Sequence, residues 1–178
     1  MKFRYLTTLP LVLALLLVSP RSIADDTRYI AKSDAEILHN VKSICVLIEE
    51  ISPEAQKDGL SKQAIQTDVE LRLRQAGIKV IPFDEGAKSS VEGGSTLYVV
   101  VNCLKMRDLP VYAYSIDVEL EDVVKLTREP HTTVFSAITW DRGSVGSVGA
   151  LHIDSIRCTV KDMTDAFLND YLKANPKK

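Results

Sequence analysis

Two kinds of apolar pattern alternate along this chain and predict its elements. Residues 44–48 form a short continuous apolar run with β-branched side chains, which is typical of a strand buried on both faces. Residues 61–76 carry apolar side chains every three or four positions, which predicts an amphipathic helix. Gly77 ends this helix, and residues 79–83 predict a short strand in which Pro82 must lie at a sheet edge or at a strand end. A strand, a helix and a strand within about 40 residues indicate a parallel βαβ unit.

The second half of the chain predicts a hairpin and a closing helix. Residues 97–104 are apolar on both sides, which favours a central strand. Residues 112–126 alternate between apolar and polar positions, so we expect an antiparallel strand with one solvated face and a bulge at Asp122. Residues 132–140 run back as the partner strand, and residues 151–173 carry an apolar stripe at helical spacing.

Polar and glycine-rich segments connect these elements. A capping box at Ser33 and Glu36 predicts a short helix over 34–42. Residues 52–60 are predicted to form a loop. Residues 143–149 have glycine at every third position, and we expect a flexible loop between the last strand and the last helix.

The order α-β-α-β-β-β-β-α predicts an α+β fold. We expect a single mixed sheet of four to five strands, with helices 61–76 and 151–173 packed on one face. Residues 33–175 are expected to form this single α/β domain, preceded by a flexible N-terminus at 25–32 and followed by a tail at 176–178.

The first 24 residues have the three-part layout of a secretory signal peptide. Lys2 and Arg4 give a basic start, residues 6–18 are largely apolar, and Ser22 and Ala24 place small residues where a signal peptidase cuts. The alternative is a transmembrane anchor, but the apolar run of about 13 residues is shorter than the roughly 20 that span a bilayer. The sequence therefore predicts cleavage after Ala24 and a periplasmic or secreted protein with no membrane span after cleavage.

The formal net charge of the chain after cleavage limits the classes of partner that we expect. Removing Lys2, Arg4 and Arg21 from 22 basic residues leaves 19 against 24 acidic residues, a formal net charge of −5. An acidic surface disfavours nucleic acid and anionic membranes as partners.

The chain has three cysteines, which could be free thiols or form a disulfide. An odd number leaves at least one thiol unbridged, although export permits disulfides. Cys45 and Cys103 fall in apolar strand runs and are predicted to be small buried side chains, with a bridge as the alternative. Cys158 falls on the polar side of the last helix, where it either contacts another part of the chain or is an accessible thiol.

No spacing of residues in the sequence specifies a chemistry, and no cofactor is predicted. His152 and Asp154 open the last helix and could supply two metal ligands, whereas catalytic zinc takes three protein ligands. The glycines of 143–149 do not have the dinucleotide-binding spacing, and no serine lies in a nucleophile elbow.

Residues 71–80, in which a helix, a glycine stop and a strand follow one another, and the strand run at 97–104 resemble a known group of domains. The chain over 44–172 is similar in layout to the anticodon-binding-like α/β domains of bacterial envelope proteins, such as the Tol-Pal propeller protein N-terminal domain and the curli secretion channel periplasmic domain. The chain departs from them in having no propeller, no lipidated cysteine and no channel-forming insertion. The resemblance implies a non-catalytic binding role in the cell envelope, and it identifies no site residue.

Two hypotheses about function follow. The first is an exported, non-catalytic protein-interaction module whose partner is a protein of the cell envelope. The long hairpin is its expected contact region, with these candidate residues at the tip: Val124, Leu126, Arg128, Glu129 and His131. The alternative is a small envelope enzyme, or a metal- or small-molecule-binding protein, that uses His152, Asp154 and Cys158 at the start of the last helix.

Overall fold

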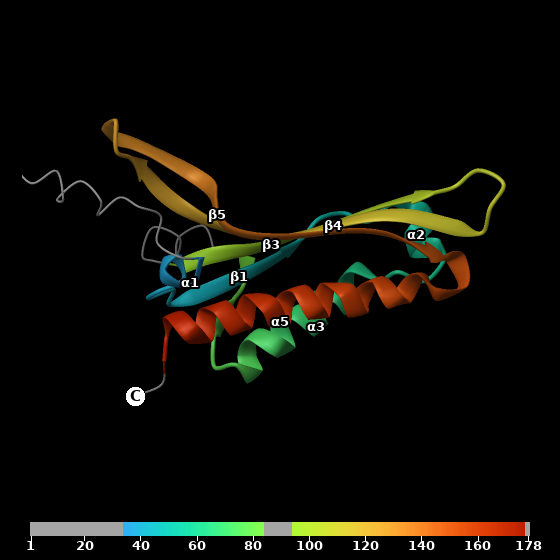
Figure 1. The fold of residues 1–178 in the computed structure, drawn as a ribbon, viewed down its shortest axis with the longest axis horizontal. Coiled ribbons are helices and arrows are strands. Elements are labelled where there is room, and N and C mark those ends of the chain that lie inside the picture. The colour runs from blue at the N-terminus through green and yellow to red at the C-terminus, as the bar shows by residue number, and fades with distance from the viewer. Residues whose placement is uncertain (1–33, 84–93, 177–178) are drawn as a thin grey trace, which may run out of the picture. The chain divides into compact units, whose positions relative to one another are not determined.

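A computed structural model describes residues 34–83 and 94–176 of the chain. Five strands in these residues form one mixed sheet (Figure 1). In chain order the strands are β1 (Ser43–Ile48), β2 (Lys79–Ile81), β3 (Gly94–Lys105), β4 (Val111–Leu126) and β5 (Glu129–Gly149).

The spatial order of the strands is β2-β1-β3-β4-β5. β1 pairs in parallel with both β2 and β3, whereas β3 pairs with β4, and β4 with β5, in antiparallel fashion. The parallel βαβ unit, the central position of β3 and the edge position of β2 are therefore confirmed. The predicted α+β class with a single mixed sheet is confirmed as well.

Helices α3 and α5 lie side by side on one face of the sheet (Figure 1). Between them, the Arg157 guanidinium approaches an Asp68 carboxylate oxygen at 2.8 Å. The packing of two helices on one face is thus as predicted. The helical segments are α1 (Asp34–Ile37), α2 (Pro53–Lys57), α3 (Lys62–Gln75), the 3-10 segment η4 (Ala150–Ser155) and α5 (Ile156–Ala174).

The core lies between this helix layer and the sheet. The apolar stripe of the last helix is buried, including Phe167, whose side chain has no exposed surface, while Tyr171 at its end is partly buried. On β4, alternate residues from Tyr112 to Leu120 face the core, and only Tyr114 among them is half-exposed. Each fully buried apolar side chain contributes about 1.5–3 kcal/mol, so this one helix supplies a large share of the gross stabilisation.

The ends of α3 follow the predicted local signals. The Ser61 hydroxyl accepts a hydrogen bond from the backbone N–H of Ala64 at 3.2 Å. Gly77 has a φ of 87°, and the N–H of Ile78 returns to the carbonyl of Leu73 at 3.0 Å. This left-handed turn satisfies a helix carbonyl and sends the chain directly into β2.

The first helix is shorter than predicted. α1 ends at Ile37 rather than at residue 42, because Asn40 takes a left-handed φ of 64°. The Asn175 side chain accepts a hydrogen bond from the Asn40 N–H at 3.0 Å, so a contact with the distant C-terminal end holds this turn. Ser33 of the predicted capping box, the predicted signal peptide and residues 25–32 lie outside the described residues.

The prediction of a flexible loop at 143–149 is wrong. These residues continue β5 and pair with β4 from Asp117 opposite Gly143 to Val111 opposite Gly149. Gly146 serves close packing, since a Cβ built on it would lie 2.6 Å from the hydroxyl oxygen of Tyr114. The Tyr114 ring therefore occupies the space that any larger residue would need.

Two further segments differ from the prediction. The loop expected at 52–60 contains the short helix α2, with Pro53 in its first turn and the Ser52 hydroxyl accepting from the Ala55 N–H at 3.3 Å. The last helix begins as the 3-10 segment η4, in which His152 has a non-helical φ of −122° and ψ of 20°. Among the described residues, no helix is both long and apolar enough to cross a membrane.

Candidate functional site

Within residues 34–83 and 94–176, no strand pairs with the outer edge of β5. β5 is the last strand in the sheet order and is 21 residues long, against about five or six for an ordinary strand. It exposes large apolar side chains, with Phe135, Ile138 and Val145 at 67%, 55% and 82% exposure. An edge of this length offers backbone N–H and C=O groups to another extended chain.

A bulge bends the β4–β5 hairpin near its tip. The pairing passes from Asp122 opposite Ala137 to Val124 opposite Val134, which leaves Val123 opposite two residues, Phe135 and Ser136. Ser136 has a φ of 55°. The bulge predicted at Asp122 is thus confirmed within one residue. Figure 1 shows the hairpin turning away from the helices beyond this point.

The residues predicted to contact a partner gather at this hairpin tip. Val124 and Leu126 are half-buried, whereas Arg128, Glu129 and His131 are exposed around the turn. The strand resumes at Glu129 rather than at residue 132, which makes the turn tighter than the sequence indicated. Their role in binding stays a prediction.

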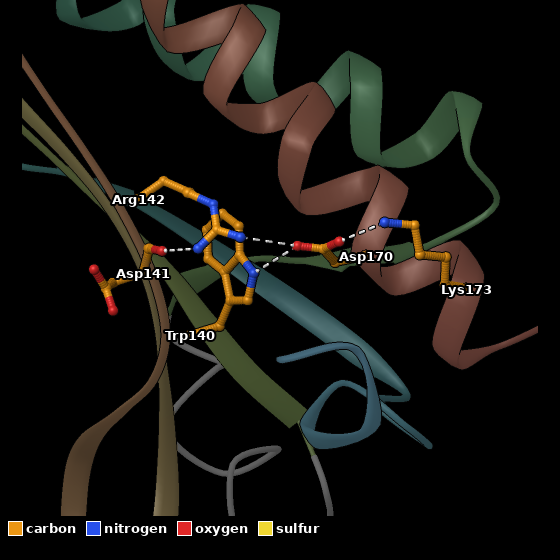
Figure 2. A network of polar contacts seen from close by, with 5 residues as sticks. All are labelled: Trp140, Asp141, Arg142, Asp170 and Lys173. Atoms are coloured by element: carbon orange, nitrogen blue, oxygen red, sulfur yellow. Dashed lines mark hydrogen bonds and ion pairs between the residues drawn. The ribbon is translucent and has the colours of Figure 1, made fainter. Parts of the chain in front are cut away.

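A polar network ties β5 to α5 (Figure 2). The Trp140 indole N–H and the Arg142 guanidinium both donate to one carboxylate oxygen of Asp170 at 3.3 Å, and the Lys173 ammonium donates to the other at 3.1 Å. The Arg142 guanidinium also lies 5.1 Å from the centre of the Trp140 ring, within cation–π range.

The charge state of Asp170 reflects this network. Burial opposes ionisation, but the hydrogen bonds from Lys173 and Trp140 and the positive charges of Lys173 and Arg142 together hold the pKa of Asp170 below its ordinary value. A carboxylate held in this way keeps the middle of β5 attached to the helix layer, while the outer edge of the strand remains accessible.

The sheet face opposite α3 and α5, which we call the open face, carries a row of carboxylates. Residues directly opposite one another in neighbouring strands lie on the same face, and Glu119 stands between Tyr98 of β3 and Asp141 of β5. Asp117 and Glu121 flank Glu119 at alternate positions of β4. We call Asp117, Glu119, Glu121 and Asp141 the open-face carboxylates.

These carboxylates repel one another. No ion pair within residues 34–83 and 94–176 involves any of the four. Burial, followed by the negative charges of Asp117, Glu121 and Asp141, raises the pKa of Glu119 above its ordinary value. The hydroxyl of Tyr98 donates to Glu49 at 2.7 Å, and this hydrogen bond with burial raises the pKa of Tyr98 to about 12.

A cavity of about 340 Å³ lies at one end of this carboxylate row. Its lining includes the exposed rings of Phe83 and Phe135, the carboxylate of Glu121 and the half-buried side chain of Leu47. The alternation over 112–126 placed Glu121 on a solvated strand face, but nothing in the sequence patterns brought Phe83 and Phe135, 52 residues apart, to one cavity.

A second cavity, of about 440 Å³, lies where β1 ends beside β3. It is lined by Glu50, Ser52, Tyr114 and the Cys103 thiol among others. Burial raises the pKa of Cys103, so this thiol is held in its protonated, poorly nucleophilic form.

The residues of the alternative, metal-binding hypothesis lie around η4. His152 and Asp154 are exposed, and Cys158 is exposed two residues into α5. Within the described part of the chain, no group of three or more histidine, cysteine or acidic side chains is placed to hold a metal ion. Cys45 is buried in β1, as its apolar surroundings indicated.

Comparison with known proteins gives only distant structural matches. No family model matches the chain, and no curated protein matches it. Two structures of the PelC dodecamer from Paraburkholderia phytofirmans, one of them a single-residue variant, match with TM-scores of 0.43 and 0.41 and sequence identities of 12% and 10%. Each match covers 75% of this chain, and the two matches cover 90% and 89% of the respective PelC chains.

A minor lipoprotein from Acinetobacter baumannii matches with a TM-score of 0.34 and 8% identity, over 75% of this chain and 92% of that one. These partial overlaps of backbone carry no inference about function. The Tol-Pal and curli domains, which the layout of the sequence resembled, are not shown by these comparisons.

Proposed function

We propose that this chain is an exported, non-catalytic protein-interaction module that binds a protein of the cell envelope through the outer edge of β5 and the tip of the β4–β5 hairpin. The observation that carries the proposal is the 21-residue edge strand with exposed apolar side chains. Soluble proteins commonly shorten, charge or cover such edges to prevent pairing, and a long accessible one favours strand addition by a partner.

Export rests on the leader. Lys2, Arg4, the apolar run and the small residues before Asp25 support cleavage by a signal peptidase. N-terminal sequencing of the protein recovered from expressing bacteria should give Asp25 as the first residue. Recovery of the intact precursor, dissolved in the cytoplasm with Met1 in place, would contradict export.

The binding surface is tested by capture of envelope proteins on the tagged full chain after chemical crosslinking in intact cells. Two variants disable the proposed surface: deletion of 124–132 with a two-residue turn in its place, and Val145→Lys, which places a charge on the outer strand. Leu71→Lys is the matched control, because Leu71 is 51% exposed but lies on α3.

We expect wild type and Leu71→Lys to capture the same partner, and both surface variants to lose it while melting cooperatively. Retention of every captured protein by both surface variants would overturn the proposal. Loss of the partner with Leu71→Lys as well would also contradict it, since the effect would then not be specific to the edge.

A further inference from the structure

We propose that the open face binds an arginine-rich segment of a partner protein, with one arginine side chain in the cavity between Phe83 and Phe135. This goes beyond the edge-strand proposal, because it uses the open face, which shares Phe135 with the edge-strand surface, and states the chemistry of the partner. It rests on the proposed function only in taking the partner to be a protein.

The open face carries unbalanced negative charge. Glu119 of β4 lies directly opposite Asp141 of the neighbouring strand β5. A carboxylate oxygen of Asp117 also lies close to β5, at 3.0 Å from the position that a Cβ on Gly143 would take. Like charges placed opposite one another destabilise a sheet. A cationic partner relieves this repulsion on binding, whereas an anionic or neutral one does not.

Among the described strands, the cations of this face lie away from the carboxylate row, and Lys125, four residues past Glu121 on β4, is exposed beyond the bulge and makes no ion pair with the row. Arg142 follows Asp141, but its side chain lies on the opposite face with Trp140 and Asp170 (Figure 2). Lys79 lies opposite Ser43 in the register of β2, three strands away from β4. The open face therefore presents a negative surface to a partner.

The cavity between Phe83 and Phe135 favours an arginine side chain over a lysine side chain. Asp122 in its lining is already hydrogen-bonded to Ser95 and Thr139, so Glu121 is the carboxylate left to receive a ligand. A guanidinium stacks on aromatic faces and pairs with a carboxylate through two parallel hydrogen bonds, and an ammonium does neither equally well. Phe83 and Phe135 provide the aromatic faces.

The spacing of the carboxylates along β4 defines the sequence repeat of the partner. Asp117, Glu119 and Glu121 occupy every second position of β4, so their Cα atoms lie about 7 Å apart. An extended partner segment with a basic side chain at every second position has the same repeat. Arginine alternating with a small polar residue therefore matches the row and delivers one guanidinium to the cavity at its end.

The test measures binding of three fluorescent peptides to the purified protein by anisotropy at low salt. The first alternates arginine and serine, the second alternates lysine and serine, and the third has the arginines grouped at one end. We expect the alternating arginine peptide to bind about fivefold to tenfold more tightly than the lysine peptide, and more tightly than the grouped one.

Variants separate the two parts of the site. Glu121→Gln and Phe135→Ala should abolish the preference for arginine, whereas Glu119→Gln should weaken both alternating peptides by the same factor. Asp162→Asn, an exposed carboxylate on α5, is the matched control and should change nothing. Equal affinity for arginine and lysine peptides, or a preference that survives Glu121→Gln and Phe135→Ala, would overturn the proposal.

The edge-strand proposal is tested apart from this one. Val145 lies opposite Ser115, on the open face beside Asp117 but six residues along β4 from Glu121. Val145→Lys should therefore lose the envelope partner and weaken the arginine and lysine peptides alike, yet keep the preference for arginine. Failure of the peptides to bind wild type would refute the open-face site and leave the edge-strand proposal standing. If both Val145→Lys and the tip deletion still captured the envelope partner while wild type bound the peptides as expected, the edge-strand proposal would be refuted and the open-face site would stand.

Discussion

Replacing Glu119 with glutamine should make the protein more stable. Glu119 faces Asp141 directly, Asp117 and Glu121 flank it, and the raised pKa of Glu119 reflects both burial and these charges. Opposed like charges on a sheet cost about 0.2–1 kcal/mol, and partial exposure keeps the cost in that range. Glu119→Gln should therefore gain up to about 1 kcal/mol, which raises the melting temperature by about 2–4 °C for a chain of this size.

The pH dependence tests the electrostatic origin of this gain. Because the pKa of Glu119 is raised on folding, the folded state binds more protons than the unfolded state at pH values between the two pKa values. Wild type thus loses stability as the pH rises through that window, and the glutamine variant does not. The gain should be present at neutral pH and should fade as the pH falls through about 4, because the glutamate becomes protonated in both states below its ordinary pKa.

Thermal melts followed by circular dichroism at pH 7 and pH 4, each at low and high salt, measure this difference. Asp162→Asn on α5 is the control, and no gain is expected from it. High salt should shrink the gain of Glu119→Gln, since these side chains are partly accessible to solvent. A gain that is absent at pH 7, or equal at pH 4 and pH 7, would refute the reasoning about repulsion on the open face.

Three further changes test the packing that positions the edge strand. Phe167→Ala should cost about 3–5 kcal/mol in urea unfolding, because its buried ring packs edge-on to Trp140 at 5.1 Å, while Leu172→Ala at a 40% exposed position should cost little. Asp170→Ala should cost about 1–2 kcal/mol at neutral pH, and because its pKa is lowered, the loss should vanish as the pH falls below about 4. Gly146→Val should destabilise through its clash with the Tyr114 ring, and Tyr114→Ala should relieve part of that cost in a double-mutant cycle.

Local sequence patterns predicted most elements because the signals act over a few residues. The Ser61 cap, the Gly77 turn and the apolar stripe that ends at Tyr171 each depend on neighbours within one or two helical turns. The alternation along β4 likewise indicated which side chains face the core. These features therefore appear in the structure where the pattern placed them.

The glycine-rich segment shows where local reasoning failed. Glycine at every third position is typical of a flexible loop, yet residues 143–149 complete β5. Position 146 has no room for a side chain because the Tyr114 ring of the neighbouring strand covers it. The two residues are 32 positions apart in the sequence. The register that brings them together is not visible in either segment alone.

The sequence by itself determined which positions are apolar, most of the helices and strands apart from α2 and the last residues of β5, and that one face of β4 is polar, because side-chain period and local capping set these properties. Only the tertiary structure decided that β5 is an edge and that Asp141 joins the β4 carboxylates. The same is true of the cavity that Phe83 and Phe135 share. Strand order and register bring together residues distant in sequence, and no short-range pattern encodes them.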